Sequence, residues 1–155
     1  MGHDKFSKVL IALDGSERSM KVTEYGITIA KKSDSSEVIA LHVIHSQIKY
    51  LYSSTVATLV TSGTIDTIVD RTKQEAQKWI TKLKEIADQN GVELKTEFTV
   101  DPASVVGAIV DYAERQNIDL IVIGSRGLSG FKKLLLGSTA SGVVTYAHCP
   151  VLVVK

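Results

Sequence analysis

Apolar and polar residues follow two different patterns along the chain, and each pattern predicts one kind of element. Short runs with few polar residues predict strands buried in a sheet. These runs are Val9 to Leu13, Val38 to Ile44, the weakly alternating Leu94 to Val100, Leu120 to Ile123, and Val151 to Val154. Between them, apolar residues recur every three or four positions, which predicts amphipathic helices. The helices are expected at about Glu17 to Lys32, Ile65 to Asn90, Asp101 to Asn117, and Ser138 to Ala147.

Several residues indicate how these elements pack, begin and end. The first helix has a face of small residues suited to close packing on a sheet, namely Thr23, Gly26, Ile27 and Ala30. Trp79 lies on the apolar stripe of the second helix, so we expect it in the core. Asp101 followed by Pro102 predicts the N-cap and first turn of the third helix. Ser46 to Gly63 shows no clear period, which predicts a long loop with at most one helical turn.

The order of these elements predicts the fold class. Five strands alternating with four helices are typical of an open, doubly wound parallel α/β sheet with helices on both faces, a Rossmann-like fold. The length of 155 residues suits a single domain over residues 1–155. In such sheets, ligands bind at the carboxyl ends of the strands, where the strand order reverses. The residues that follow each strand are therefore the candidates for function.

A glycine-rich stretch follows the fourth predicted strand. Gly124, Gly127 and Gly130 come at intervals of three, and Gly137 to Thr139 stand at the head of the last predicted helix. Without a Cβ, the backbone N–H groups of glycines can approach an anion, and a helix start adds unpaired N–H groups and a positive dipole end. Strand, glycine loop and helix start together predict a phosphate-binding site. A plain turn followed by an N-cap is the alternative that this pattern leaves open.

Side chains near the glycine loop favour phosphate as the ligand. Ser138 and Thr139 can contribute hydroxyl groups, and Arg126, Lys132 and Lys133 can offset the charge of a phosphate. The spacing excludes the P-loop, because no lysine stands in the GK[ST] arrangement. It also excludes the dinucleotide fingerprint, because the glycines do not fall as G-x-G-x-x-G.

Polar residues also follow the first two strands. Asp14 comes directly after the first strand and faces the same edge of the sheet. It can hold a ligand there or cap the first helix together with Ser16, and the residues alone leave both roles open. His42 and His45 are not spaced with a carboxylate as in a metal site or a catalytic triad. We therefore assign no catalytic residue.

Composition and charge exclude several classes of protein. A hydrophobic content of 44% and a charged content of 23% are ordinary for a globular protein. The net charge of +1 gives no reason to expect a nucleic acid or an anionic membrane as partner. No apolar run approaches the roughly 20 residues that span a bilayer. Met1 to Phe6 lacks the apolar segment of a secretory signal, so we expect a cytoplasmic protein.

The spacing of the glycines resembles a family motif. Gly124, two residues, Gly127, nine residues and then Gly137-Ser138 resemble the G-2x-G-9x-G-[ST] motif of ATP-binding universal stress proteins. Lys8 to Ser16 and Cys149 to Val154 resemble the first and last strands of that family. The resemblance implies the strand order 3-2-1-4-5 and a bound ATP, or a related adenine nucleotide, with Mg²⁺. The cofactor-binding residues that it implies are Ala12, Leu13, Asp14, Val43, Ile123, Gly124, Arg126, Gly127, Gly137, Ser138 and Thr139.

The resemblance also implies roles for some of these residues. In the family, residues corresponding to Ala12, Leu13 and Val43 line the base, and the aspartate corresponding to Asp14 contacts the ribose or the metal-bound phosphates. Asp14 is therefore also the expected metal ligand. Family members commonly dimerise through an apolar edge strand, so we expect a homodimer through Val151 to Val154.

Three functions are compatible with such a site. The first is a binding and signalling module of the stress response, in which an adenine nucleotide sets the conformation or the choice of partner. The second is a slow ATPase or phosphotransferase, which needs a group to position the attacking water or acceptor. The third, a nucleotide alpha hydrolase or adenylating ligase, is disfavoured because Leu13 to Glu17 does not match an S-G-G-x-D-S loop. We expect the first.

Overall fold

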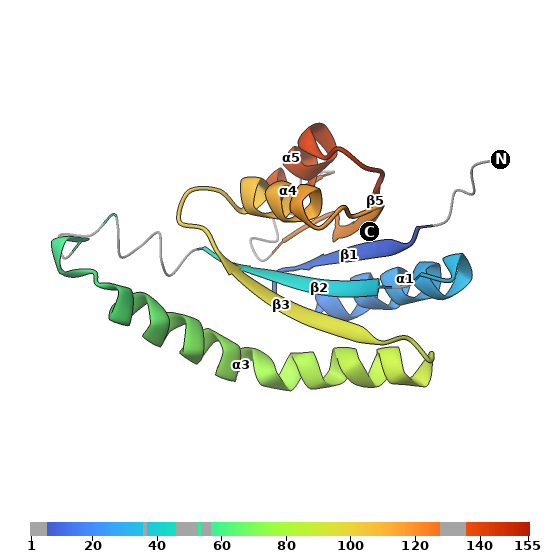
Figure 1. Ribbon diagram of the computed structural model, residues 1–155, viewed down its shortest axis with the longest axis horizontal. Helices are drawn as coiled ribbons and strands as arrows, with labels where there is room; N and C mark the ends of the chain where they lie inside the picture. Colours follow the sequence, from blue (N-terminus) through green and yellow to red (C-terminus); the bar gives the residue numbers. More distant parts are fainter. Residues whose placement is uncertain (1–5, 36, 46–52, 54–56, 128–135) are drawn as a thin grey trace.

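Five parallel strands form the centre of the molecule, in the order β3-β2-β1-β4-β5. The computed structural model describes residues 6–35, 37–45, 53, 57–127 and 136–155, and Figure 1 shows its sheet between two layers of helices. The strands are β1 (Lys8–Leu13), β2 (Glu37–Ile44), β3 (Leu94–Val100), β4 (Leu120–Gly124) and β5 (Val151–Val154). Each strand is parallel to its neighbours. The predicted α/β fold and its strand order are confirmed.

Helices cover both faces of this sheet. They are α1 (Arg18–Ser33), α3 (Ser62–Gln89), α4 (Val105–Arg115) and α5 (Ser138–Tyr146), with a 3₁₀ helix, η1, at Ala57–Leu59. In Figure 1, α1 and α3 lie on one face of the sheet, and α4 and α5 lie on the other. Within the described part of the chain, no helix combines the length and the apolar character needed to cross a membrane.

β1 is covered on both faces, which explains its unbroken apolar run. Val9, Leu10 and Ile11 have no exposed surface. Because successive side chains of a strand point to opposite faces, Val9 and Ile11 belong to the core formed with α1 and α3. Leu10 and Ala12 belong to the core formed with α4 and α5. β1, the middle strand of the sheet, is therefore buried on both of its faces.

The small-residue face of α1 packs against the sheet as predicted. Its buried residues include Thr23, Gly26, Ile27 and Ala30. A Cβ placed on Gly26 would lie 2.5 Å from Cδ1 of Ile11. The close approach of α1 to β1 therefore depends on the missing side chain of this glycine.

α3 begins earlier than predicted, at Ser62 rather than Ile65. Thr61 Oγ1 accepts a hydrogen bond from Thr64 N at 3.3 Å, and Thr64 Oγ1 accepts one from Thr61 N at 3.5 Å. This reciprocal capping starts the helix within the segment predicted as a loop. The prediction missed it because a threonine, rather than glutamate or glutamine, completes the capping box. Of that segment, residues 46–52 and 54–56 lie outside the described residues.

The predicted N-cap of the third helix was wrong. The N-cap of α4 is Ser104, whose Oγ accepts a hydrogen bond from Gly107 N at 2.9 Å. Asp101 forms a turn before the helix, because its Oδ1 accepts hydrogen bonds from Ala103 N and Ser104 N. A short polar side chain before a proline serves a turn as readily as a helix start, so the local pattern did not distinguish the two.

The strand order opens a crevice at one edge of the sheet. β1 and β4 are neighbours, with Ala12 paired to Ile123. After β1 the chain continues into α1 on one face, whereas α5, after β4, lies on the other face. The carboxyl ends of β1 and β4 therefore meet where no helix crosses between them, which is where ligands bind in such sheets.

The packing of α5 on α4 generates a stability prediction. A Cβ on Gly142 would lie 2.6 Å from Cγ2 and 2.9 Å from Cγ1 of Val106. Because the Val106 side chain is β-branched, it cannot easily rotate to make room for that Cβ. We expect Gly142→Ala to lower the free energy of unfolding by about 1 to 3 kcal/mol in urea titrations. Gly63→Ala is the control, because Gly63 lies exposed on α3 and its nearest neighbour to a new Cβ is Thr61 Oγ1 at 3.6 Å. Equal stability of the two variants would contradict the tight contact between α4 and α5.

Candidate functional site

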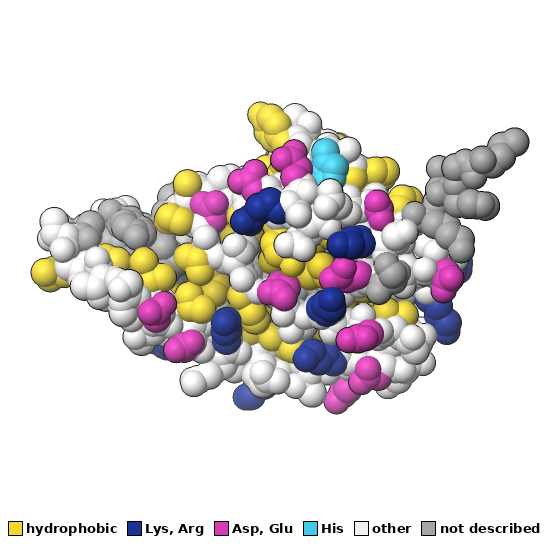
Figure 2. Space-filling model, in the orientation of Figure 1, with side chains coloured by type: hydrophobic (Ala, Val, Ile, Leu, Met, Phe, Trp, Pro, Cys, Tyr) yellow, Lys and Arg dark blue, Asp and Glu magenta, His cyan; other side chains and the backbone are white. Residues whose placement is uncertain are grey.

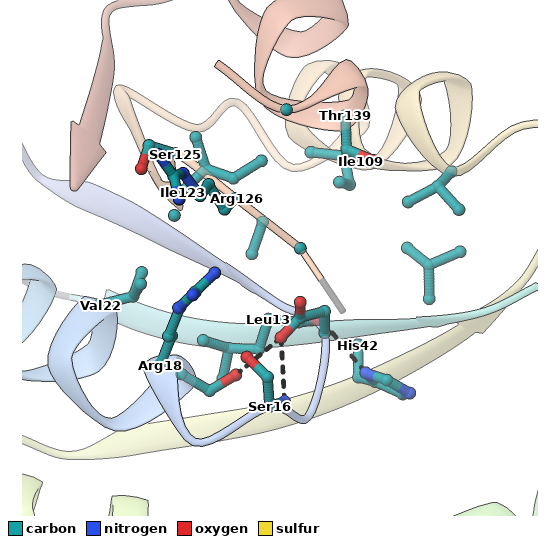
Figure 3. A pocket seen from close by; sticks show the side chains of 18 of the residues that line it. Leu13, Ser16, Arg18, Val22, His42, Ile109, Ile123, Ser125, Arg126 and Thr139 are labelled. Atoms are coloured by element: carbon teal, nitrogen blue, oxygen red, sulfur yellow. Dashed lines mark hydrogen bonds between the residues drawn. The ribbon is translucent and has the colours of Figure 1, made fainter. Parts of the chain in front are cut away.

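A cavity of about 370 Å³ lies at the carboxyl edge of the sheet. Figure 3 shows it between the strand ends, with Arg18 and Val22 of α1 on one side and Ile109 and Thr139 on the other. Small-molecule sites in proteins have volumes of roughly 300 to 1,000 Å³. The cavity is therefore large enough for a nucleotide-sized ligand that stays partly exposed.

All of the residues predicted to bind a cofactor line this one cavity. They are Ala12, Leu13, Asp14, Val43, Ile123, Gly124, Arg126, Gly127, Gly137, Ser138 and Thr139. They come from the ends of β1, β2 and β4, from the loop after β4 and from the start of α5. Gly130, Lys132 and Lys133, which the sequence also placed near a phosphate, lie outside the described residues.

The cavity has further lining residues that the sequence did not assign to it. These are Ser16, Arg18, Ser19, Val22, His42, His45, Val105, Ile109 and Ser125. Arg18 and Ser19 follow Asp14 closely, so proximity along the chain could have pointed to them. Val105 and Ile109 belong to the apolar side of α4, and no local signal separates a cavity wall from a core position.

Asp14 combines the two roles that the sequence left open. Its Oδ1 accepts hydrogen bonds from Ser16 N at 2.9 Å and from Ser19 Oγ at 3.2 Å, so it stabilises the turn into α1. Gly15 has a positive φ of 79° in this turn, a conformation that favours glycine. The other oxygen, Oδ2, lies 3.5 Å from where a Cβ on Gly127 would stand. Asp14 thus also faces the glycine loop across the crevice.

The glycine loop closes directly onto the start of α5. Gly137 N donates a hydrogen bond to Ser125 O at 2.6 Å, and Ser125 N donates one to Val154 O at 2.7 Å. A Cβ on Gly137 would lie 3.2 Å from Ser125 O, so a larger residue there must displace the loop. Gly137 is the N-cap of α5 and has no side chain to cap the first amides. The amides of the first turn remain available to an acceptor such as a phosphate oxygen.

The opposite side of the cavity is apolar. It is formed by Ala12 and Leu13 of β1, Val43 of β2, Ile123 of β4 and Ile109 of α4. The site therefore has an apolar part, suited to a flat ring, and a part rich in N–H and hydroxyl donors, suited to an anion. Both chemistries occur in a nucleotide.

His42 also lines the cavity, as a neutral side chain. Its Nδ1 lies 3.1 Å from Leu13 O, so this nitrogen carries the hydrogen and donates to the carbonyl. The ring makes edge contacts with Trp79 at 5.7 Å and Phe98 at 5.9 Å between centroids. Burial lowers the pKa of His42, against the smaller raising effects of the Leu13 carbonyl and Asp14. His42 is thus uncharged at neutral pH, and Trp79, expected in the core, lies half-buried at its margin beside this histidine.

Ser16 has an unsatisfied polar atom in the cavity wall. Its Oγ is buried, and it has no hydrogen-bond partner within the described part of the chain. Such an atom costs free energy unless a ligand or water completes its hydrogen bonds. A ligand with hydroxyl or phosphate oxygens would do so.

The site fits a metal only together with a ligand. Among the described residues, no group of three or more His, Cys, Asp or Glu side chains is placed to hold an ion by itself. Mg²⁺ commonly binds one or two carboxylates, several waters and the phosphates of a nucleotide. The Oδ2 of Asp14 suits that arrangement, because the hydrogen bonds of Asp14 to described residues engage its Oδ1.

Comparison with known proteins identifies the family. The chain matches the model of the universal stress protein family over residues 5–155. The chain belongs to the universal stress protein family. This universal stress protein is 37% identical to a relative in Methanocaldococcus jannaschii over 155 residues, which cover 99% of this chain and 85% of the relative.

Solved universal stress proteins have the same fold. One from Lactobacillus plantarum superposes with a TM-score of 0.75 at 25% identity, covering 97% of this chain and 99% of its own. A universal stress protein in complex with cAMP superposes with a TM-score of 0.65 at 22% identity, covering 97% and 98% of the two chains. Another, from Archaeoglobus fulgidus in complex with dAMP, has a TM-score of 0.64 at 20% identity, covering 97% and 99%. Two solved members of the fold thus carry adenine nucleotides.

Ser16 offers a test of the site that separates binding from stability. Because its Oγ makes no hydrogen bond in the described part of the chain, Ser16→Ala should leave the thermal unfolding temperature unchanged or raise it. Affinity for ATP should fall by about tenfold if a ligand completes that hydrogen bond. Ser19→Ala is the control, because Ser19 Oγ donates to Asp14 and its loss should cost stability of about 1 kcal/mol. A loss of stability in Ser16→Ala without a change in affinity would contradict the assignment.

Proposed function

We propose that this universal stress protein binds ATP or a related adenine nucleotide together with Mg²⁺, and acts as a nucleotide-dependent module in stress signalling. One observation carries the proposal. The residues of the glycine motif, the aspartate after β1 and the apolar ends of β1, β2 and β4 surround a single cavity of about 370 Å³. The parallel sheet brings these strand ends together, and the groups that they carry, an apolar surface, a carboxylate and N–H donors, are the set that a nucleotide requires.

The apolar part of the cavity suits the adenine ring. Ala12, Leu13 and Val43 approach it from β1 and β2, and Ile109 approaches it from α4. A flat aromatic ring gains free energy by removing these surfaces from water. His42, neutral because of its burial, closes this part without placing a charge against the base.

The polar part suits the phosphates. The start of α5 presents backbone amides and the side chains of Ser138 and Thr139, and Arg126 follows β4 on the neighbouring loop. Charge-assisted hydrogen bonds to phosphate oxygens are about twice as strong as neutral ones. Asp14 would hold Mg²⁺ or the ribose, and a Mg²⁺ bound there would neutralise phosphate charge next to the carboxylate.

The same geometry favours binding over hydrolysis. Asp14 is the sole carboxylate among the described lining residues, and its Oδ1 already accepts two hydrogen bonds. A hydrolase needs a group that positions the attacking water. No described contact assigns that task to a residue, so we propose nucleotide binding and not turnover as the activity.

Calorimetric titration of nucleotide-free protein with ATP and Mg²⁺ tests the proposal. We expect micromolar binding to the parent and at least about tenfold weaker binding to Gly137→Val, since one charge-assisted hydrogen bond is worth about 1.5 to 3 kcal/mol. The physical reason is the 3.2 Å separation between a new Cβ and Ser125 O, which forces the loop away from α5. The φ of Gly137 is −66°, so valine does not strain the backbone itself.

Gly63→Val is the matched control, because Gly63 lies exposed on α3, away from the cavity lining. It should bind ATP as the parent does. Failure of the parent to bind, or equal affinity in Gly137→Val, would mean that the glycines only shape the loop and that the protein acts through its surface.

We also propose that the protein forms a homodimer through β5. This strand pairs only with β4 and leaves its other edge open within the described sheet. Ile121 N donates to Pro150 O and Ser125 N donates to Val154 O, so the alternate residues Val151 and Val153 direct their N–H groups away from β4. An apolar strand with an open edge invites pairing with a second copy.

Sedimentation velocity at micromolar concentration tests the dimer. We expect a dimer for the parent and a monomer for Val153→Pro, which removes one outward N–H group but leaves the hydrogen bonds to β4 intact. Val153→Ala keeps that N–H group and should remain dimeric. A monomeric parent, or a dimeric Val153→Pro, would show that β5 is not the interface.

A further inference from the structure

A second cavity of about 470 Å³ adjoins the first, beside α1 and the carboxyl ends of β4 and β5. Arg18, Val22, Gly124, Ser125 and Arg126 line both cavities. The shared residues include Gly124, the first glycine of the loop. The second cavity therefore lies next to the part of the site proposed to hold phosphates, on the side of α1.

Cationic side chains dominate this second cavity. Arg18, Lys21, Arg126 and Lys155 line it, and none of its described lining residues has a carboxylate side chain. Figure 3 shows Arg18 extending from α1 toward the strand end that carries Ser125 and Arg126. Like charges in one concave space repel one another, so an anion bound beside Arg18 and Lys21 lowers the electrostatic energy.

Arg18 and Lys21 differ from the paired lysines elsewhere on the sheet. Lys8 and Lys95 both form ion pairs with Glu37, at 3.3 and 2.8 Å. By contrast, the side chains of Arg18 and Lys21 have no hydrogen bond or ion pair with another residue in the described part of the chain. Their charges are available to a ligand.

Arg18 and Lys21 lie at the end of α1 where the helix dipole disfavours positive charge. The first turn of α1 contains Arg18 and Lys21 and no acidic residue, the N-cap Glu17 makes no side-chain capping hydrogen bond, and the nearest engaged carboxylate is that of Asp14, in the turn before the helix. The unpaired N–H groups and the positive dipole end at a helix start favour anions and disfavour cations. A local arrangement that costs stability is expected at functional sites.

We propose that this second cavity binds a phosphate group additional to those held at the glycine loop. The nucleotide part of this inference rests on the proposed function. Either the terminal phosphates of the same nucleotide or a separate phosphorylated molecule can supply the group, because both present the same anionic oxygens. Arg18 and Lys21 are its binding residues, and the guanidinium and ammonium groups suit phosphate oxygens. When the nucleotide supplies the group, the protein discriminates between adenine nucleotides by the number of their phosphates.

The double variant Arg18→Gln/Lys21→Gln tests the proposal by calorimetric titration with ATP, AMP and inorganic pyrophosphate. It removes two charges and retains side chains of similar length. We expect ATP affinity to fall by about tenfold or more and AMP affinity to change by less than about twofold. The unfolding temperature without ligand should stay the same or rise, because two cations leave the positive end of the helix dipole.

Lys31→Gln/Lys32→Gln is the matched control. Lys31 and Lys32 lie in the last turn of α1, so this variant removes the same charge from the same helix, far from the cavity lining. It should bind ATP and pyrophosphate as the parent does. The comparison separates a local contact from a general effect of net charge.

Each outcome decides the question. Loss of ATP affinity with AMP affinity kept assigns the second cavity to the terminal phosphates of the nucleotide. Pyrophosphate that binds the AMP-loaded parent but not the Arg18→Gln/Lys21→Gln variant, while ATP binds both proteins equally, assigns it to a separate phosphorylated molecule. A variant that binds ATP and pyrophosphate as tightly as the parent overturns the proposal. If the parent binds no adenine nucleotide, the proposed function fails, and the titration with pyrophosphate then tests the second site by itself. Pyrophosphate that binds the parent and not the variant supports the second site. Pyrophosphate that binds neither protein overturns it.

Discussion

The pairing of β1 with β4 is the contact on which the rest of the molecule depends. It joins strands from opposite ends of the chain, with Val9 beside Leu120 and Ala12 beside Ile123. Because β1 then has a partner on each side and a core on each face, its side chains are almost entirely removed from water. The helices that follow β1 and β4 lie on opposite faces, so the crevice between the strand ends stays open.

The site exploits this crevice with two kinds of group. Apolar side chains from β1, β2, β4 and α4 supply one wall, and they are held rigidly because the same strands form the core. Backbone amides supply much of the other wall, where Gly137 brings the loop after β4 against the start of α5. The φ of Gly137, −66°, is ordinary for any residue, so a glycine is not needed there for its backbone conformation. It is needed because a Cβ would lie 3.2 Å from Ser125 O.

Charge is distributed unevenly around the site. Burial keeps His42 neutral, and Asp14 supplies a single carboxylate that also holds the turn into α1. Arg18 and Lys21 then place positive charge at the start of that helix, where the helix dipole disfavours it. Lys8 and Lys95, by contrast, both pair with Glu37. The proposed phosphate beside Arg18 and Lys21 would offset this positive charge. Figure 2 shows positive and negative side chains interspersed over the face in view.

The fold class and the approximate bounds of the elements could be predicted from the amino-acid sequence, and the residues predicted for the site line one cavity. Runs such as Val9 to Leu13 and the repeats in α3 reflect local periods, and Gly124 to Ser138 has a characteristic spacing, so both can be read without a structure. Helix starts were less predictable, because a short polar residue can either cap a helix, as Thr61 does, or stabilise a turn before it, as Asp101 does. The three-dimensional arrangement was needed to see that Ile109 lines the cavity and that Arg18 lines the same two cavities as Arg126. Those facts depend on which distant strands pair, and pairing is governed by burial of the whole sheet and not by any local pattern.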